Sequence, residues 1–318
     1  MDLSLSDEQQ QIADSATTFL QEASAMPSVR AVSESASGLD DALWRGIAEL
    51  GWCGVHLPES AGGLGLGLVE LVLLQEQLGR RLACVPFFDS VALAATVLRE
   101  LPGSALAQEW LELLASGEKI GALAWPVSPV AAARARARRT DTGWTLDGDW
   151  PQVGSAALAD ALLLPAQGES GESLLFAVPA DATGLQVQPL TTLDTTRRMA
   201  QVECQAVNLP VENCIGQGAP LGAVLARTLQ LGAIALAAEQ VGVAQQCLDL
   251  TLAYAAQRVQ FDRPIAGFQA VKHRCAQMLV ALESARSAVY GAACIADTAP
   301  DAATLLLHAA QALVAATE

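Results

Sequence analysis

The sequence predicts an α+β protein in which a middle β-domain separates two helical regions. Helical patterns of apolar residues occupy residues 1–118 and return after residue 218. Between them lie short β-rich runs separated by Gly, Pro and Asp, which is typical of a small antiparallel barrel or sandwich. We therefore expect an N-terminal helical domain (1–118), a middle β-domain (119–218) and a C-terminal helical bundle (219–318).

The first region begins with a helix start signal. Ser6 and Gln9 resemble a capping box ahead of an apolar helical pattern. A second helix is expected from Leu39 to Leu50, ending at Gly51. The glycine-rich loop GWCGVHLPESAGGLGLG then leads into an apolar helix that we expect to stop near Gly79. The loop lacks both the preceding strand of a dinucleotide fingerprint and a P-loop lysine, so we interpret it as a turn that lets helices pack closely.

The middle and last regions differ in periodicity. The β-rich runs are GWTLDGDW, ALLLPA, SLLFAVPA, GLQVQPL and RMAQVECQAVNLPV. Apolar helical periodicity then continues from Leu225 to Tyr254. A second long helix is expected to begin at Pro264, whose fixed φ suits a helix start, and a third near Asp301. The long helices are apolar on more than one face, which predicts burial against partner subunits.

Composition argues against several classes of function. No apolar run is long and uninterrupted enough to demand a membrane span, although 52% of the residues are hydrophobic. The net charge of −16 argues against nonspecific binding to nucleic acid or anionic membrane. The start, MDLSLSDEQQ, lacks the regions of a secretory signal, and seven scattered cysteines without a CxxC motif predict reduced thiols in a cytoplasmic protein. Three histidines without ligand-like neighbours argue against a histidine-based metal site.

Two groups of arginines offer a local basic pocket that could hold a CoA ester. They are Arg134, Arg136, Arg138 and Arg139, and separately Arg197 and Arg198. The first group alternates, so on a strand its members would point to one face. The alternative interpretation is a solvated strand edge that is protected by charge.

The most informative stretch is YAAQRVQFDRPIAGFQ, at the junction of two expected helices. It contains Arg258, Phe261 and Gln269. An Arg can pair with a diphosphate, an aromatic ring can lie against a nucleotide, and Gln can hydrogen-bond to polar edges. On chemistry alone, a solvated turn with a structural Arg is the alternative.

The segment RVQFDRPIAGFQAVKHRCAQMLVALESAR resembles the acyl-CoA dehydrogenases, FAD enzymes that introduce an α,β double bond into acyl-CoA thioesters. The stretches ELGWCGVHLPESAGGLGLGLVELVLLQEQLGRRLACVPF and LDTTRRMAQVECQAVNLP are similar to other parts of that family, so the resemblance covers essentially the whole chain. It implies that Arg258, Phe261 and Gln269 reach the diphosphate and adenosine half of an FAD held mainly by a neighbouring subunit. The family often has Gly where this chain has Asp262, which would place a negative charge near the diphosphate.

Two segments that hold the flavin ring in the family are altered here. The family's segment near LTEPxxGSD corresponds to LAWPVSPVA, residues 123–131, which places Trp125 and Pro129 where an acid and a Gly are usual. Prolines in place of Gly remove amide donors and backbone freedom. The second segment, usually similar to GxKxFITNA, reads GDWPQVGSAALAD, with Trp150 and Pro151 in place of Lys and an aromatic residue. Ser155 could supply a hydroxyl, but we assign it no role.

The catalytic base of the family is also missing from its expected positions. The reaction needs a carboxylate that takes the α-proton of the substrate. Most of the family places this Glu after a QxxGGxG segment, which the sequence up to Glu318 does not reach. Some relatives place it on the long helix, at a position that aligns with Gly232. We interpret Glu239 and Glu283 as salt-bridge residues, so we assign no catalytic residue.

A shortened sequence would explain the missing base but not Trp125 and Pro129, whereas a degenerate subunit would explain both departures. The resemblance implies FAD as the cofactor, an acyl-CoA substrate and an electron-transfer acceptor. In heterotetrameric relatives, associated with bulky CoA esters such as those of steroid side chains, one chain carries the Glu and the flavin-ring site and the other supplies the adenosine side. Our first hypothesis is a subunit that completes the FAD site of a homologous partner. The alternatives are an active homo-oligomer with an unrecognised base and a non-catalytic scaffold.

Overall fold

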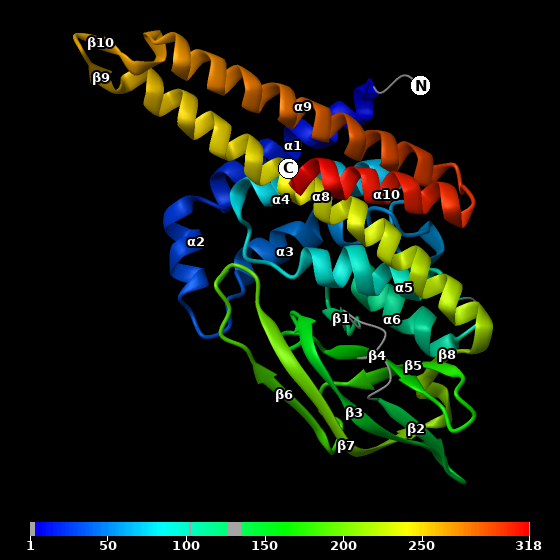
Figure 1. Cartoon of the computed structure of the whole chain (residues 1–318). Helices are drawn as coiled ribbons and strands as arrows, with labels where there is room; N and C mark the ends of the chain where they lie inside the picture. Colours follow the sequence, from blue (N-terminus) through cyan, green and yellow to red (C-terminus); the bar gives the residue numbers. More distant parts are fainter. Residues whose placement is uncertain (1–3, 102, 126–134, 318) are drawn as a thin grey trace. The chain divides into compact units, whose positions relative to one another are not determined.

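The computed structural model describes residues 4–101, 103–125 and 135–317, which belong to two compact units. The helical unit comprises Met1–Met26, Gly67–Ala83 and Gln230–Glu318, and the β-containing unit comprises Pro27–Leu66 and Cys84–Leu229 (Figure 1). The long helix α8 (Gly218–Gln257) contributes residues to both units.

The β-containing unit begins with short helices. They are α2 (Met26–Ser33), α3 (Asp41–Glu49), a π-helical segment (Phe88–Ala95), α5 (Thr96–Arg99) and α6 (Ala105–Ala115). The side chain of Asp40 caps α3 by accepting a hydrogen bond from the Leu43 amide at 3.0 Å. Gly51, with φ of 74°, follows the end of α3, so the helix expected over Leu39–Leu50 is confirmed.

The glycine-rich loop after α3 is a tight turn rather than a phosphate cradle. Gly62 and Gly65 have φ of 76° and 66°, which glycine adopts without steric cost. A Cβ at Gly63 would lie 2.3 Å from the carbonyl oxygen of Leu57, so only glycine allows this backbone approach. No strand precedes the loop among the described residues, and it leads into helix α4 (Leu68–Arg81).

The same unit contains a mixed sheet of eight strands. They are β1 (Gly121–Leu123), β2 (Arg136–Arg139), β3 (Gly143–Gly154), β4 (Ala161–Gln167), β5 (Ser173–Pro179), β6 (Leu185–Pro189), β7 (Met199–Pro210) and β8 (Cys214–Gln217). The order is β6-β7-β3-β2-β4-β5-β8, with β1 beside β4. Most neighbours are antiparallel as expected, whereas β1 and β2 each pair with β4 in parallel. All five β-rich runs of the sequence are strands.

One apolar core joins the sheet to the helices within this unit. Alternate residues of β4 and β5, such as Leu163 and Leu175, are 1% and 0% exposed and pack with Leu98, Leu111 and Ile215. Period-two alternation places these side chains on one face of the sheet. The core therefore holds α5, α6 and the β8–α8 junction against the strands.

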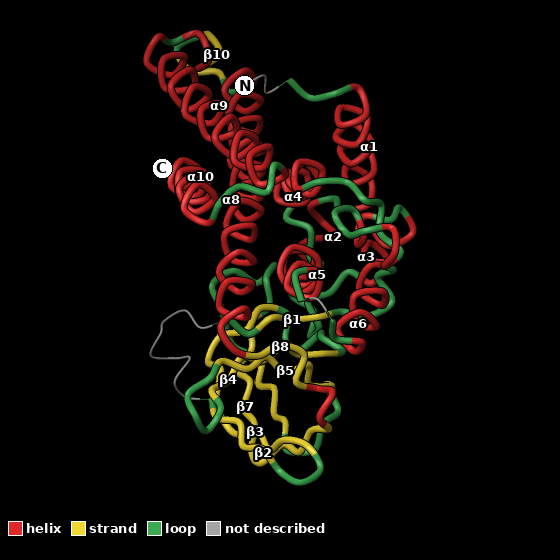
Figure 2. The backbone as a smooth tube through the Cα atoms, turned by 90° about the vertical axis from the view of Figure 1, so that its right-hand side faces the viewer, coloured by secondary structure: helices red, strands yellow, loops and turns green. Residues whose placement is uncertain are grey.

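The helical unit consists of α1 (Asp7–Ala23), α4, the main part of α8, α9 (Gln269–Asp297) and α10 (Ala302–Thr317). The predicted capping box of α1 is present: the Gln9 amide donates to the Ser6 hydroxyl at 3.2 Å, and the Ser6 amide donates to the Gln9 side chain at 3.0 Å. Figure 2 shows α10 alongside α9, its neighbour in the chain.

Glycines bring α4 and α8 unusually close. A Cβ on Gly79 would lie 2.2 Å from the carbonyl oxygen of Glu239, and one on Gly242 would lie 1.9 Å from that of Glu76. The expectation that the helix stops near Gly79 is confirmed: α4 ends at Arg81, and Gly79 lies in its last turn, where it contacts α8.

The ends of the last helices refine two expectations. Pro264 ends a short strand, and α9 begins at Gln269 after a 3₁₀ turn, because Pro264 is used in a β-hairpin instead of a helix start. The third helix begins where the sequence predicts, since α10 starts at Ala302; Asp301 caps it by accepting a hydrogen bond from the Thr304 amide at 2.9 Å. By length and composition alone, α8 and α9 are apolar enough to cross a membrane, a property that core helices of soluble proteins share.

The order of helices, strands and helices along the chain confirms the predicted fold class. Helices precede Gly121, strands extend from Gly121 to Gln217, and helices dominate after that. The three domain boundaries of the sequence analysis stay a prediction, since the two compact units divide the chain differently from the order of its elements.

Candidate functional site

Arg258, Phe261 and Gln269 gather on one hairpin of the helical unit. Helix α8 ends at Gln257, strands β9 (Val259–Gln260) and β10 (Arg263–Pro264) pair antiparallel, and α9 starts at Gln269. The hairpin lies at the far end of the α8–α9 helix pair (Figure 1). The Arg258 carbonyl accepts from the Ile265 amide at 2.8 Å, which closes the hairpin directly beneath Arg258.

The hairpin turns at two residues in the left-handed region. Phe261 has φ of 55° and Asp262 has φ of 58°. A two-residue turn with both φ values positive is the type I′ geometry that matches strand twist, and it favours Asn-Gly. A bulky residue held there costs roughly 1–2 kcal/mol, so the surrounding contacts must hold Phe261 in place. The same geometry would favour a Gly at the position of Asp262.

An aromatic stack supports Phe261. Its ring meets that of Phe268 edge to face, with centroids 6.1 Å apart and planes at 82°. The guanidinium of Arg263 lies 4.0 Å from the centroid of Phe268 on a ring face. Phe261 itself is 87% exposed, so the stack presents an aromatic ring to the outside of the unit.

The two polar members of the site are exposed as well. Arg258 forms no ion pair and no side-chain hydrogen bond with any residue that the structure describes. The side-chain amide nitrogen of Gln269 (Nε2) lies 3.4 Å from the Nε2 atom of His273, one turn along α9. A free guanidinium, an exposed ring and an amide on one hairpin suit a diphosphate and a purine that approach from outside.

The hairpin carries a local positive charge in an acidic protein. Between residues 258 and 274 there are four basic side chains and one acidic one, a difference of +3, whereas the chain as a whole carries −16. All five of these side chains are exposed. The charge of Asp262 is therefore outweighed locally, and an anion is attracted to this end of the helix pair.

On the side expected to face the flavin ring, Ser155 is committed to the interior of the β-containing unit. Its hydroxyl donates to Asp89 Oδ2 at 2.6 Å, and its amide donates to the Arg198 carbonyl at 2.8 Å. Burial raises the pKa of the Asp89 carboxyl, while the nearby charge of Arg197 and the bond from Ser155 oppose that rise. A Cβ on Gly154 would lie 2.2 Å from Asp89 Oδ1, so Gly154 makes room for this buried pair.

The other altered ring-side positions are also occupied by internal contacts. Trp150 is 5% exposed and its Nε1 donates to the Pro165 carbonyl at 3.2 Å. Trp125 packs against the apolar core, and Ala124 is fully buried. Residues 126–131 of the same segment lie outside the described residues. The described positions present no free hydroxyl or cation to a flavin ring.

The carboxylates considered as bases take part in contacts within the helical unit. Glu239 accepts a hydrogen bond from the Gln75 side chain, and Glu283 pairs with Arg286. Gly232, at the alternative base position, offers no side chain. Assigning no catalytic residue stays a prediction, and the described residues contain no cluster of three or more potential metal ligands.

The two groups of arginines differ in their surroundings: Arg197 and Arg198 make contacts inside the β-containing unit, whereas the described members of the first group lie on β2. Arg198 donates to the carbonyls of Ser33 and Ser35 at 2.9 and 2.7 Å, and Arg197 lies 4.8 Å from the ring centroid of Phe88. In the first group, Arg134 lies outside the described residues. The remaining three are on β2, which lies between β3 and β4 but pairs with β4 only through Arg136 and Gln167. The expectation that they point to one face is wrong, because Arg136 and Arg138 line one pocket and the next residue, Arg139, lines another.

Two features of the site were missed in the sequence. The first is the stack of Arg263, Phe268 and Phe261. Its only signal in the sequence is a cationic residue and aromatic residues close to Pro264, and a solvated turn can have the same spacing. The buried pair of Asp89 and Ser155 joins residues that are far apart in the chain and carries no local signal.

Comparisons with known proteins agree with the order of elements. The family models "Acyl-CoA dehydrogenase, N-terminal domain" and "Acyl-CoA dehydrogenase, C-terminal domain" match residues 6–118 and 222–317. Acyl-CoA dehydrogenase IpdE2 of Mycobacterium tuberculosis is 33% identical over 311 residues, which cover 96% of this chain and 82% of that protein.

Two solved structures of similar fold are multi-protein assemblies by their names. The ChsE4–ChsE5 complex from Mycobacterium tuberculosis matches with a TM-score of 0.86 and 30% identity over 99% of this chain and 86% of that chain. A variant of the Tcur3481–Tcur3483 steroid ACAD matches with a TM-score of 0.82 and 32% identity over 98% of this chain and 86% of that chain.

The cofactor of the family fits the residues at the hairpin better than those on the ring side. Arg258 has no side-chain partner among the described residues and Phe261 is exposed, whereas the Ser155 hydroxyl donates to Asp89. The hairpin therefore suits the diphosphate and adenosine half of FAD. The chain belongs to the acyl-CoA dehydrogenase family and is an FAD-dependent oxidoreductase of that family.

Proposed function

We propose that this protein is one subunit of a hetero-oligomeric acyl-CoA dehydrogenase and completes the FAD site of a homologous, catalytically competent partner. The observation that carries the proposal is the contrast between the exposed Arg258 and Phe261 and the internally bound Ser155 and Trp150. The side chains suited to the diphosphate and adenosine half of FAD are exposed. The described side chains on the flavin-ring side form hydrogen bonds inside the β-containing unit instead.

Within such a complex, the side chains of the hairpin have distinct tasks. When bound, FAD supplies the two-electron acceptor of the dehydrogenation. Arg258 pairs with the diphosphate, Phe261 packs against the nucleotide, and Gln269 fixes it by hydrogen bonds. The partner chain provides the carboxylate that removes the α-proton of the acyl-CoA.

Names of similar proteins support a hetero-oligomer and a bulky substrate. The ChsE4–ChsE5 complex and the Tcur3481–Tcur3483 steroid ACAD each carry two protein names, and the second is named for steroids. Exposed apolar side chains on α8, α9 and α10, among them Leu250, Val280 and Leu307 at 59, 66 and 56%, offer contact area for other subunits. We infer a steroid-type or similarly bulky acyl-CoA as the substrate class. We also infer a cytoplasmic location, in keeping with seven cysteines that form no disulfide bond.

Arg258→Ala tests the role of the hairpin. The protein is co-expressed with a homologous acyl-CoA dehydrogenase chain from the same organism as its candidate partner, and bound FAD is measured in the purified complex. Loss of one charge-assisted pair predicts FAD affinity lower by roughly ten- to a hundredfold. Arg45→Ala, which removes an exposed arginine from α3, is the matched control and should leave FAD content unchanged. Equal FAD content in the Arg258 variant and the wild type would exclude the assigned role.

A further inference from the structure

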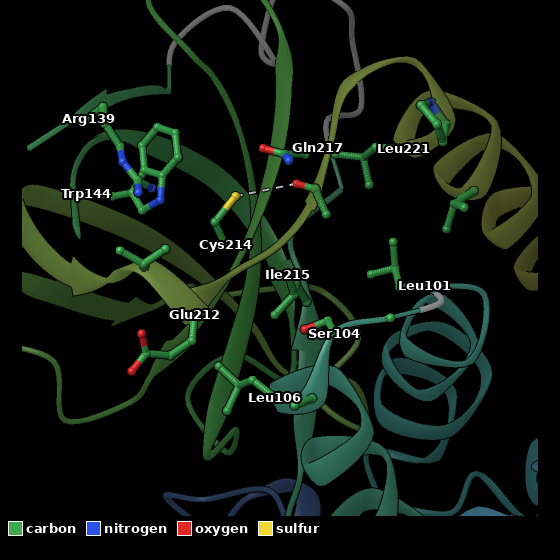
Figure 3. A pocket seen from close by; sticks show the side chains of 16 residues that line it. Leu101, Ser104, Leu106, Arg139, Trp144, Glu212, Cys214, Ile215, Gln217 and Leu221 are labelled. Atoms are coloured by element: carbon green, nitrogen blue, oxygen red, sulfur yellow. Dashed lines mark hydrogen bonds between the residues drawn. The ribbon is translucent and has the colours of Figure 1, made fainter. Parts of the chain in front are cut away.

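The β-containing unit holds an open pocket whose lining residues differ from those assigned to FAD. Its volume is about 890 Å³, and it is lined by residues of β2, β3, the β8–α8 junction and the chain leading into α6. Figure 3 shows Arg139 and Trp144 at one end, Leu101 and Leu221 at the other, and Cys214 between them. Sites of a few hundred to a thousand Å³ are the size at which proteins enclose small organic molecules.

One end of the pocket is apolar and preformed. Ile215 and Leu221 are 5% and 1% exposed and belong to the apolar core of the unit. Leu101, Leu106 and Val224 pack against that core and also line the pocket. Because this wall is fixed by the core, an apolar ligand could pack against it without ordering new side chains.

The other end carries an incompletely satisfied polar pair. Arg139 and Trp144 are directly opposite each other on β2 and β3, and the guanidinium lies 4.8 Å from the centroid of the indole. Trp144 is 8% exposed, and its Nε1–H finds no hydrogen-bond acceptor among the described residues. A buried N–H without an acceptor is destabilising, so an acceptor supplied by a ligand would be stabilising.

The charge at this end favours an anion. Arg139 forms no ion pair within the part of the chain that the structure describes, although Glu212 also lines the pocket. A carboxylate can accept from an indole N–H and pair with a guanidinium at the same time.

We propose that this pocket binds a small monocarboxylate with an extended apolar body, such as a free fatty acid or a carboxylated polycyclic molecule. The carboxylate accepts a hydrogen bond from Trp144 Nε1 and pairs with Arg139, while the apolar body lies along Leu101, Ile215 and Leu221. The residues differ from those that we assign to FAD, so the two proposals stand or fall separately.

Calorimetric titration of the full-length protein with decanoate tests the site. The result expected is saturable binding of one decanoate per chain. Decanol, which has the same chain without the charge, is expected to bind about tenfold or more weakly, as befits the loss of a charge-assisted hydrogen bond. Absence of saturable decanoate binding, or equal affinity for decanol, would overturn the proposal. A cholanic-type acid titrated in parallel distinguishes a fatty acid from a carboxylated polycyclic molecule as the ligand. Tighter binding of decanoate indicates the first, and tighter binding of the cholanic-type acid indicates the second.

Matched variants locate the carboxylate. Arg139→Gln is expected to weaken decanoate about tenfold, and Trp144→Phe to weaken it by a similar factor while keeping the aromatic contact with Phe176. Arg138→Gln removes the same charge from the opposite face of β2, where Arg138 lines a different pocket with Thr145, and should bind like the wild type. Equal weakening by the Arg138 and Arg139 variants would show a general charge effect and overturn the assignment. Circular dichroism of each variant separates lost binding from lost folding.

Discussion

At the scale of single residues, the conformation of Phe261 is the feature most closely tied to function. The residue adopts a left-handed φ of 55° and remains 87% exposed, two unfavourable conditions for a large aromatic side chain. Both are maintained by Phe268 and Arg263, which form a stack behind the exposed ring. Backbone strain that persists at an exposed turn is common at sites that bind ligands.

Phe268→Leu should loosen this support while keeping an apolar residue ahead of α9. An edge-to-face aromatic pair contributes about 0.5–1.5 kcal/mol, so we expect FAD affinity of the complex to fall roughly three- to tenfold. The measurement is FAD titration of the apo complex by quenching of flavin fluorescence. A variant with unchanged affinity would mean that Phe261 is positioned by its backbone alone.

His56 makes stability depend on pH. Its Nε2 lies 2.9 Å from the Thr96 hydroxyl, and burial, assisted by the charge of Arg99, lowers the pKa of the imidazole from 6.5 to about 3. The unfolded chain therefore binds a proton between pH 6.5 and 3 that the folded protein excludes. The stabilising effect of the neutral imidazole is complete above pH 6.5 and is lost as the pH falls through this window.

Urea unfolding at several pH values measures this effect by comparing the wild type with His56→Gln. We expect the free energy of unfolding of the wild type to fall more steeply below pH 6.5, by up to ~1.4 kcal/mol per pH unit. The difference between the two curves isolates His56 from Asp89, whose raised pKa acts in the opposite direction. Parallel curves would contradict a neutral, buried His56.

At the scale of elements, a polar network ties α4, α8 and α9 together inside the helical unit. Glu76 on α4 accepts from Tyr290 at 2.8 Å and from Arg286 at 3.1 Å, both on α9. Arg286 also donates to Gln245 on α8 at 2.7 Å. The Glu76 side chain is 6% exposed and that of Arg286 is 17% exposed, so this ion pair is largely removed from water.

Arg286→Ala would leave the buried Glu76 carboxylate without its cation. Breaking such a pair costs about 3 kcal/mol or more, so we expect a loss of that order in the free energy of unfolding. Lys272→Ala removes an exposed charge from the same helix and should change stability by less than about 0.5 kcal/mol. Denaturant unfolding of both variants decides the matter, and similar stabilities would show that the network contributes little.

Local sequence patterns predicted the helices and strands well, whereas features that depend on long-range contacts were predicted poorly. The strands, the Ser6 capping box and the cap at Asp301 follow from residues close together in the sequence, and the structure has them. The expected role of Pro264 as a helix start was wrong because Pro264 closes a hairpin instead. The contact of Gly79 with α8 was not predicted, because it depends on tertiary packing. Likewise, the parallel neighbours of β4 depend on crossovers that no local pattern encodes.

At the scale of the whole molecule, the distribution of charge and exposed groups is uneven. The chain carries −16, yet residues 258–274 carry a difference of +3. Arg258, Phe261 and Gln269 are identifiable from sequence because they are adjacent in the chain. The engagement of Ser155 by Asp89 was not predictable, since the two lie 66 residues apart. The contrast between the exposed hairpin residues and the buried Ser155 supports a subunit that contributes to an FAD site without supplying all of it.

The measurement that tests this account most directly is FAD per chain, by absorbance and mass, for the protein alone and for its complex with the homologous partner. We predict no bound flavin in the protein alone and about one FAD per heterodimer in the complex, as expected for a site that is incomplete in one chain. Full flavin occupancy in the isolated protein would contradict the account, because it would require a complete site within copies of this chain.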